Sequence, residues 1–139
     1  MDPKEVIKKK YITDGKDIYG FYTGLTLLNQ FELTSQVPNV LEIVTNHEAT
    51  NSRRVKVGSQ DIIIKKSRVK INNINYKELM LLELFNIIKL KKPTRITSVS
   101  KYMKENKILL KNILDYANDY PAKATKNLIL CQETNDDTF

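Results

Sequence analysis

Residues 20–68 read GFYTGLTLLNQFELTSQVPNVLEIVTNHEATNSRRVKVGSQDIIIKKSR, and this stretch joins a short helix, a polar linker and a basic hairpin in one run. Residues 24–31 place apolar side chains at helical spacing, with Thr23 where an N-cap would stand, so one or two helical turns are predicted. A polar linker follows, and Pro38 prevents the helix from running through it. Residues 40–45 are rich in β-branched side chains and predict a buried strand.

A basic β-hairpin is predicted next. Strands near 53–57 and 61–69 flank a turn in which Gly58 supplies the unusual dihedral angle. Valines alternate with basic residues in the first strand, so one face can pack while the other stays solvated. Seven bases and a single acid, Asp61, lie within residues 53–70, and such clustering is typical of a phosphate-facing surface. The candidate nucleic-acid-binding residues are Arg53, Arg54, Lys56, Lys65, Lys66, Arg68 and Lys70.

The remainder of the chain is predicted to be helical. Asn75 followed by Glu78 is a capping box, and the helix it opens is apolar on nearly every side. This pattern favours a central core helix, with an interface to another protein as the alternative. A second helix is expected over 97–118 and a short final helix over 121–131. Four lysines form a basic ridge on the second helix, for which a solvated face is the default interpretation: Lys101, Lys104, Lys107 and Lys111.

These elements predict one α+β domain, in which a small, mostly antiparallel sheet carrying the basic hairpin is followed by a helical C-terminal half. The length of 139 residues fits a single domain with its own core. The boundaries expected are a flexible lead-in over 1–10, the domain over 11–131 (sheet-rich over 11–72, helical over 73–131), and a disordered acidic tail over 132–139. A first strand is expected near 17–22.

Composition narrows the class of protein. Hydrophobic residues make up 41% and charged residues 28% of the chain, which are ordinary globular values. Cys131 is the single cysteine, and no apolar run reaches the length of a membrane span or signal peptide, so a cytoplasmic location without a membrane partner is expected. The net charge of +7 favours an anionic partner, although 19 lysines, 15 isoleucines and 13 asparagines also reflect AT-rich codon usage.

The chain offers little catalytic chemistry. His47 is the single histidine, so no Ser-His-Asp triad is supported, and it cannot build a zinc site with one cysteine. The four glycines match no phosphate-loop spacing. A metal-dependent nuclease built on Glu42, Asp61 and Lys65 is the sharper enzymatic alternative, but the spacing is loose. We therefore expect a non-enzymatic protein without a cofactor.

The succession of helix, linker, strand and basic hairpin resembles the AbiEi-type antitoxins of type IV toxin–antitoxin and abortive-infection systems. Gln36, with Pro38 beside it, is the best marker of the resemblance, and its amide is expected to dock the linker onto a backbone carbonyl. A weaker similarity covers residues 120–125. The matching residues are Gly24, Leu28, Asn29, Leu33, Thr34, Gln36, Val37 and Pro38.

The resemblance implies a phage-defence antitoxin that counteracts a nucleotidyltransferase toxin and regulates transcription by binding DNA. Full-length members similar to this chain begin with a winged helix-turn-helix, and this sequence opens about where the wing would close. We therefore expect that domain to be lacking, with the basic surface left to contact DNA or RNA. Two alternatives stay open: a nucleic-acid-binding fragment of a transcriptional regulator, and a protein-interaction or inhibitor domain for a different acidic partner.

Overall fold

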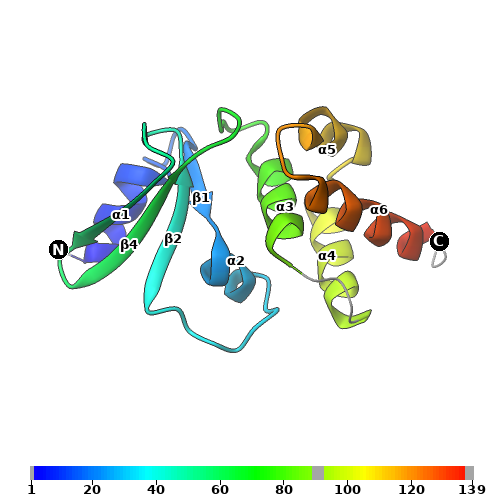
Figure 1. Ribbon diagram of the computed structural model, residues 1–139, viewed down its shortest axis with the longest axis horizontal. Helices are drawn as coiled ribbons and strands as arrows, with labels where there is room; N and C mark the ends of the chain where they lie inside the picture. The colour runs from blue at the N-terminus through cyan, green and yellow to red at the C-terminus, as the bar shows by residue number, and fades with distance from the viewer. Residues whose placement is uncertain (1, 89–92, 137–139) are drawn as a thin grey trace.

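The computed structural model describes the backbone of residues 2–88 and 93–136 and the side chains of residues 2–88 and 98–131. Within these ranges the fold is α+β, with a four-stranded sheet followed by a helical C-terminal half (Figure 1). The elements are α1 (Pro3–Tyr11), β1 (Gly20–Tyr22), α2 (Gly24–Gln30), β2 (Val40–Thr45), β3 (Ser52–Val57), β4 (Gln60–Lys66), α3 (Tyr76–Ile87), α4 (Pro93–Glu105), α5 (Leu110–Ala117) and α6 (Ala122–Asp136).

The strands are ordered β1-β2-β4-β3. β1 pairs with β2 and β3 pairs with β4 in antiparallel fashion, whereas β2 and β4 are parallel neighbours. Gly58 turns the β3–β4 hairpin with a φ of +60°, a conformation that glycine adopts without strain. The predicted α+β class, the mostly antiparallel sheet and its basic hairpin are thus confirmed, and β3 lies at one edge of the sheet.

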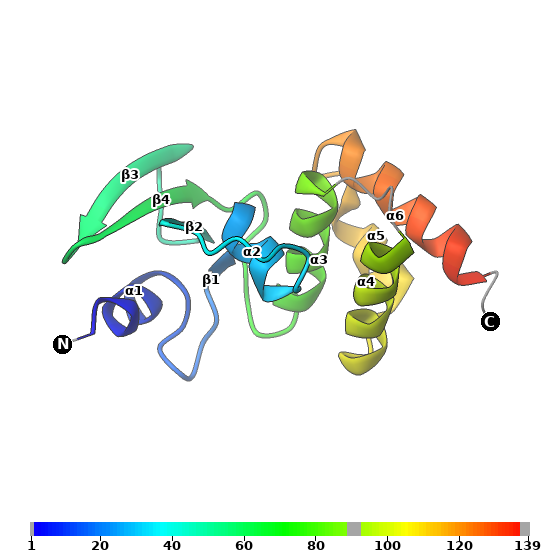
Figure 2. The same cartoon turned by 90° about the horizontal axis from the view of Figure 1, so that it is seen from below.

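The expected flexible lead-in over residues 1–10 is wrong, because α1 packs across one face of the sheet (Figure 2). Asp2 caps this helix by accepting a hydrogen bond from the Lys4 N–H at 3.0 Å. Ile7 and Tyr11, one turn apart, are buried against isoleucines of β2 and β4. Two apolar positions were too few to reveal a helical period, yet they suffice to anchor a helix of nine residues.

The helical half is built around α3, which lies between the sheet and the remaining helices (Figure 1). Five of its side chains are fully buried: Leu79, Leu81, Leu82, Leu84 and Phe85. This confirms the prediction of a core helix. The capping box is wrong, however, because the Asn75 side chain accepts from the Asn72 N–H and donates to the Lys70 carbonyl, each at 2.9 Å.

The predicted helix over 97–118 is two helices, α4 and α5. The helix is interrupted at Lys107, which has a left-handed φ of +53°. The Ile108 N–H donates a hydrogen bond to the Met103 carbonyl at 2.9 Å and so caps the C-terminal end of α4. Burial of Ile108 stabilises this turn, and the lysine ridge is interrupted there. The disordered tail is wrong for residues 132–136, which continue α6, and residues 137–139 lie outside the described part of the chain.

Candidate nucleic-acid interface

The structure divides the seven candidate residues between the two faces of the hairpin. Arg54 and Lys65 share the face of Ile63, while Arg53 lies opposite Ile64 on the face that packs against α1. Lys66 follows the same alternation as Ile64. The predicted basic residues therefore do not form one continuous face, although the valines of β3 do separate from Arg54 and Lys56 as predicted.

Three of the seven form ion pairs, two with carboxylates of the sheet and one with a carboxylate of the loop after β2. Arg54 lies 3.5 Å from Asp61, and Lys65 lies 3.5 Å from Glu42. Arg53 binds Glu48 through two of its nitrogens, at 3.0 and 3.2 Å. Hydrogen bonds from the Thr50 hydroxyl and from Arg53 lower the pKa of Glu48, so this buried carboxylate stays ionised and neutralises the arginine. Arg53 is therefore a structural cation.

The other four candidates, Lys56, Lys66, Arg68 and Lys70, are exposed and form no ion pair with any of the described residues. Arg68 has a second contact, because its guanidinium carbon lies 5.6 Å from the ring centroid of Tyr120, between α5 and α6. These four positions carry the uncompensated charge of the hairpin and of the segment that follows it.

The segment after β4 is held by asparagine side chains. The Asn46 amide donates to the Ile71 carbonyl at 2.7 Å, while its oxygen accepts from the Ile71 N–H at 2.8 Å and from the Ser67 hydroxyl at 3.0 Å. Asn75 holds the Lys70 carbonyl. The sequence did not predict this role of Asn46, because an asparagine after a β-branched run indicates only that the strand ends there. Because both ends of the segment are fixed, Arg68 is presented at a defined place.

A pocket of about 460 Å³ lies where the end of β4 meets α3. Glu83 of α3 lines it, is largely buried, and accepts a hydrogen bond from the Thr23 hydroxyl at 2.6 Å. Thr23 stands at the N-cap position of α2, but its hydroxyl makes this bond instead of the predicted cap. The pocket thus combines cations from the sheet with a carboxylate from the helical half. Its lining includes Lys65, Lys66, Arg68, Asn51, Glu83 and Asn86.

The alternative nuclease site does not assemble. Glu42 is paired with Lys65 and Asp61 with Arg54, so neither carboxylate is directed at a shared metal position. Among the described side chains, no three histidine, cysteine or acidic residues come close enough to hold a metal ion. The three candidates lie on two neighbouring strands, but ion pairing accounts for their arrangement.

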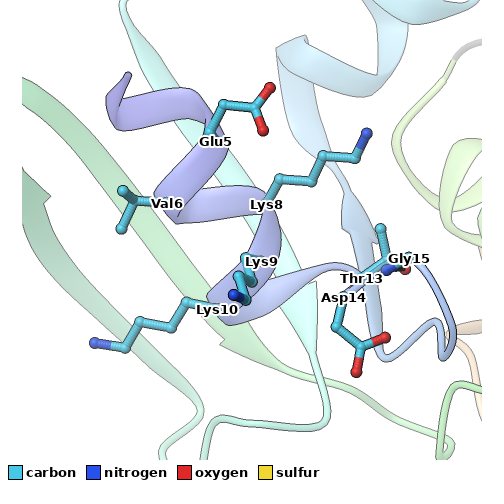
Figure 3. Close-up of a pocket in the computed structure, with 8 residues that line it drawn as sticks. All are labelled: Glu5, Val6, Lys8, Lys9, Lys10, Thr13, Asp14 and Gly15. Atoms are coloured by element: carbon cyan, nitrogen blue, oxygen red, sulfur yellow. Dashed lines mark hydrogen bonds between the residues drawn. The ribbon is translucent and has the colours of Figure 1, made fainter. Parts of the chain in front are cut away.

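A second hollow, of about 630 Å³, lies along α1 and the loop that follows it. Figure 3 shows that its charged side chains diverge: Lys8 and Lys10 point in different directions, and the carboxylates of Glu5 and Asp14 lie on different sides. No group of polar atoms converges on one point. This hollow is an open surface along the N-terminal helix, and its lysines are exposed to solvent.

The residues that carry the family resemblance form one structural unit around α2. Gly24 has a φ of +60°, a conformation that favours glycine, and a Cβ there would lie 1.7 Å from Oε2 of Glu42, whose side chain would have to move. The Asn29 amide donates to the Gln36 carbonyl at 2.9 Å and holds the linker against the helix. The Gln36 side chain is exposed and makes no hydrogen bond to the described residues, so its predicted docking role is wrong. Val37 beside it is 81% exposed.

No family model, curated protein or solved structure matches this chain. Across the described helices, none has the length and apolar character that crossing a membrane requires.

Proposed function

We propose that this protein is a non-enzymatic antitoxin that binds and counteracts a nucleotidyltransferase toxin, and that its basic hairpin contacts nucleic acid. The observation that carries the proposal is the unit formed by α2, the linker and β2. Its residues resemble the AbiEi-type pattern, and two of them have structural roles: Gly24 adopts a positive φ, and Asn29 holds the linker by a hydrogen bond. The remaining exposed residues of the motif are then available to a partner.

The linker supplies the proposed toxin contact. Val37 projects into solvent next to the exposed Gln36, and the Asn29 hydrogen bond limits how far the linker moves. An apolar side chain on a pre-organised loop binds a partner at low entropic cost. Such binding requires no catalytic group, in keeping with the ion-paired carboxylates of the sheet.

The nucleic-acid contact is assigned to the cations that lack an ion pair among the described residues. Phosphate contacts of this kind are independent of sequence and typically give a Kd of about 10⁻⁴ to 10⁻⁶ M at physiological salt. Affinity is then expected to fall steeply as salt concentration rises, because counterions are released from the nucleic acid. An apolar protein interface does not show that dependence.

Growth rescue tests the antitoxin function. The chain is co-expressed with a nucleotidyltransferase toxin encoded beside its own gene, and rescue of growth is expected for the parent protein. Val37→Asp should abolish rescue, whereas Ile74→Asp should not, since Ile74 is an equally exposed apolar residue on a different loop. Failure of the folded parent to rescue growth, or full rescue by Val37→Asp, contradicts the proposal.

A salt titration tests the nucleic-acid contact. A triple variant with Lys56, Lys66 and Lys70 replaced by Ser should lose affinity for duplex DNA and have a shallower salt dependence. The matched control replaces Lys8, Lys9 and Lys10, which removes the same charge from α1. Equal losses in the two variants would indicate that net charge alone, and no hairpin surface, determines binding.

A further inference from the structure

We infer that the pocket between the end of β4 and α3 binds a single unpaired nucleotide. The inference rests on the phosphate-contacting role proposed for the hairpin and assigns that role to one place in it. β4 runs toward α3 (Figure 2), so side chains that are distant in sequence meet in this pocket. Its volume of about 460 Å³ falls within the range of about 300–1,000 Å³ that is usual for small-molecule sites.

Three cations form the phosphate side of the pocket. Lys65, Lys66 and Arg68 come from four consecutive residues. Strand alternation sets Lys65 and Lys66 on opposite faces, but both line this hollow because β4 ends there. Asn46 fixes the chain on both sides of Arg68, through hydrogen bonds to Ser67 and to the backbone of Ile71. Because only Lys65 has a carboxylate partner among the described residues, Lys66 and Arg68 retain their charge for a ligand.

Glu83 forms the side of the pocket that is expected to contact the nucleobase. Its side chain is largely buried, and one of its carboxylate oxygens accepts the Thr23 hydroxyl at 2.6 Å. A buried carboxylate is costly unless its acceptor capacity is used, and one hydroxyl uses only part of it. Asn86, three residues further along α3, lies on the same side of the helix and adds an amide to this wall.

This pairing of groups defines the ligand. A carboxylate accepts hydrogen bonds from the N–H groups of a base, and guanine offers two adjacent ones on its Watson–Crick edge. That edge is already paired in a duplex, so only an unstacked, unpaired base can reach Glu83. Val44 and Ile87 supply apolar wall for the ring. A guanine nucleotide fits best, with its phosphate on Lys66 and Arg68.

Calorimetric titration of the full chain tests this inference, with GMP, AMP, CMP, UMP and inorganic phosphate as ligands. GMP should bind more tightly than the other nucleotides and than phosphate. Glu83→Gln keeps the acceptor for Thr23 but loses the charge, and should weaken GMP binding about tenfold or more, since hydrogen bonds to charged groups are stronger than those to neutral groups. Its affinity for inorganic phosphate should stay unchanged.

Two lysine variants separate the phosphate side from general charge. Lys66→Ser should weaken both GMP and phosphate, whereas Lys9→Ser, which removes an equal charge from α1, should affect neither. Circular dichroism confirms that each variant is folded. If no nucleotide binds better than inorganic phosphate, or if folded Glu83→Gln binds GMP like the parent, the inference is wrong.

A short RNA strand with one guanosine distinguishes the source of the nucleotide. Tighter binding of the strand than of GMP identifies a nucleotide within a single strand, while equal binding identifies a free nucleotide, and both results support the pocket. The same RNA in a duplex should bind without sensitivity to Glu83→Gln. Growth rescue is scored independently: rescue without nucleotide binding refutes this inference alone, and nucleotide binding without rescue refutes the antitoxin function alone.

Discussion

Replacing Asn46 by Ala should loosen the connection between the sheet and the helical half. The Asn46 side chain makes three hydrogen bonds, two to the backbone of Ile71 and one to the Ser67 hydroxyl. At about 0.5–1.5 kcal/mol net for each bond, the loss amounts to about 1.5–4.5 kcal/mol of unfolding free energy. Urea unfolding followed by circular dichroism measures it as a lower midpoint with an unchanged slope.

The matched control is Asn106→Ala, because Asn106 makes one side-chain hydrogen bond, to the Tyr102 carbonyl at 2.9 Å. Its expected cost is about 1 kcal/mol. Hydrogen exchange at the Ile71 amide gives a local measurement and should accelerate only in the Asn46 variant. If Asn46→Ala costs no more than the control and leaves this exchange rate unchanged, the segment is held by something other than Asn46.

Further perturbations test the core, a glycine and the ion pair of a buried carboxylate. Phe85→Ala should cost about 3–5 kcal/mol in urea unfolding, since Phe85 is fully buried; a small cost with lost self-association would mark an interface instead. Gly24→Ala should cost about 1–3 kcal/mol because of its positive φ, and adding Glu42→Ala should recover part of this by removing the clash. The pKa of Glu48 is lowered from 4.5, so its contribution to stability is present above that value and is lost as pH falls through the native pKa. Glu48→Gln should make the unfolding free energy less dependent on pH in this acidic range, as measured by urea unfolding at a series of pH values.

The sheet could be predicted from local signals. β2 occupies residues 40–45 as expected, because its β-branched run is bounded by polar residues on both sides. The hairpin was evident from Gly58 and from the alternation of Val and basic residues. The same alternation, applied to every basic residue of the hairpin, also places Arg53 and Lys66 on the opposite face from Arg54. The sequence prediction applied it only to part of β3.

Other features depended on tertiary contacts that no local pattern specifies. The turn at Lys107 that separates α4 from α5 contains no glycine, so no local signal predicts it, and burial of Ile108 stabilises it. The pocket combines Lys66 with Glu83, which belong to different elements and are brought together by the segment that Asn46 holds. Glu83 looked like one polar position on an apolar helix, and only its bond to Thr23 shows that it is buried and engaged.

The basic residues of the sheet carry their charge for two different reasons, and the strand on which each residue lies indicates which reason applies. β3 is an edge strand, and charged side chains on an edge hinder pairing with another chain, so Arg54 and Lys56 have a protective role that requires no ligand. β4 is an interior strand, paired on both sides, and edge protection does not apply to it. Lys65 and Lys66 end this strand beside Arg68, where the pocket opens. Under the proposed function the ligand contacts fall at the end of β4, on Lys66 and Arg68, and the edge strand adds long-range attraction to them.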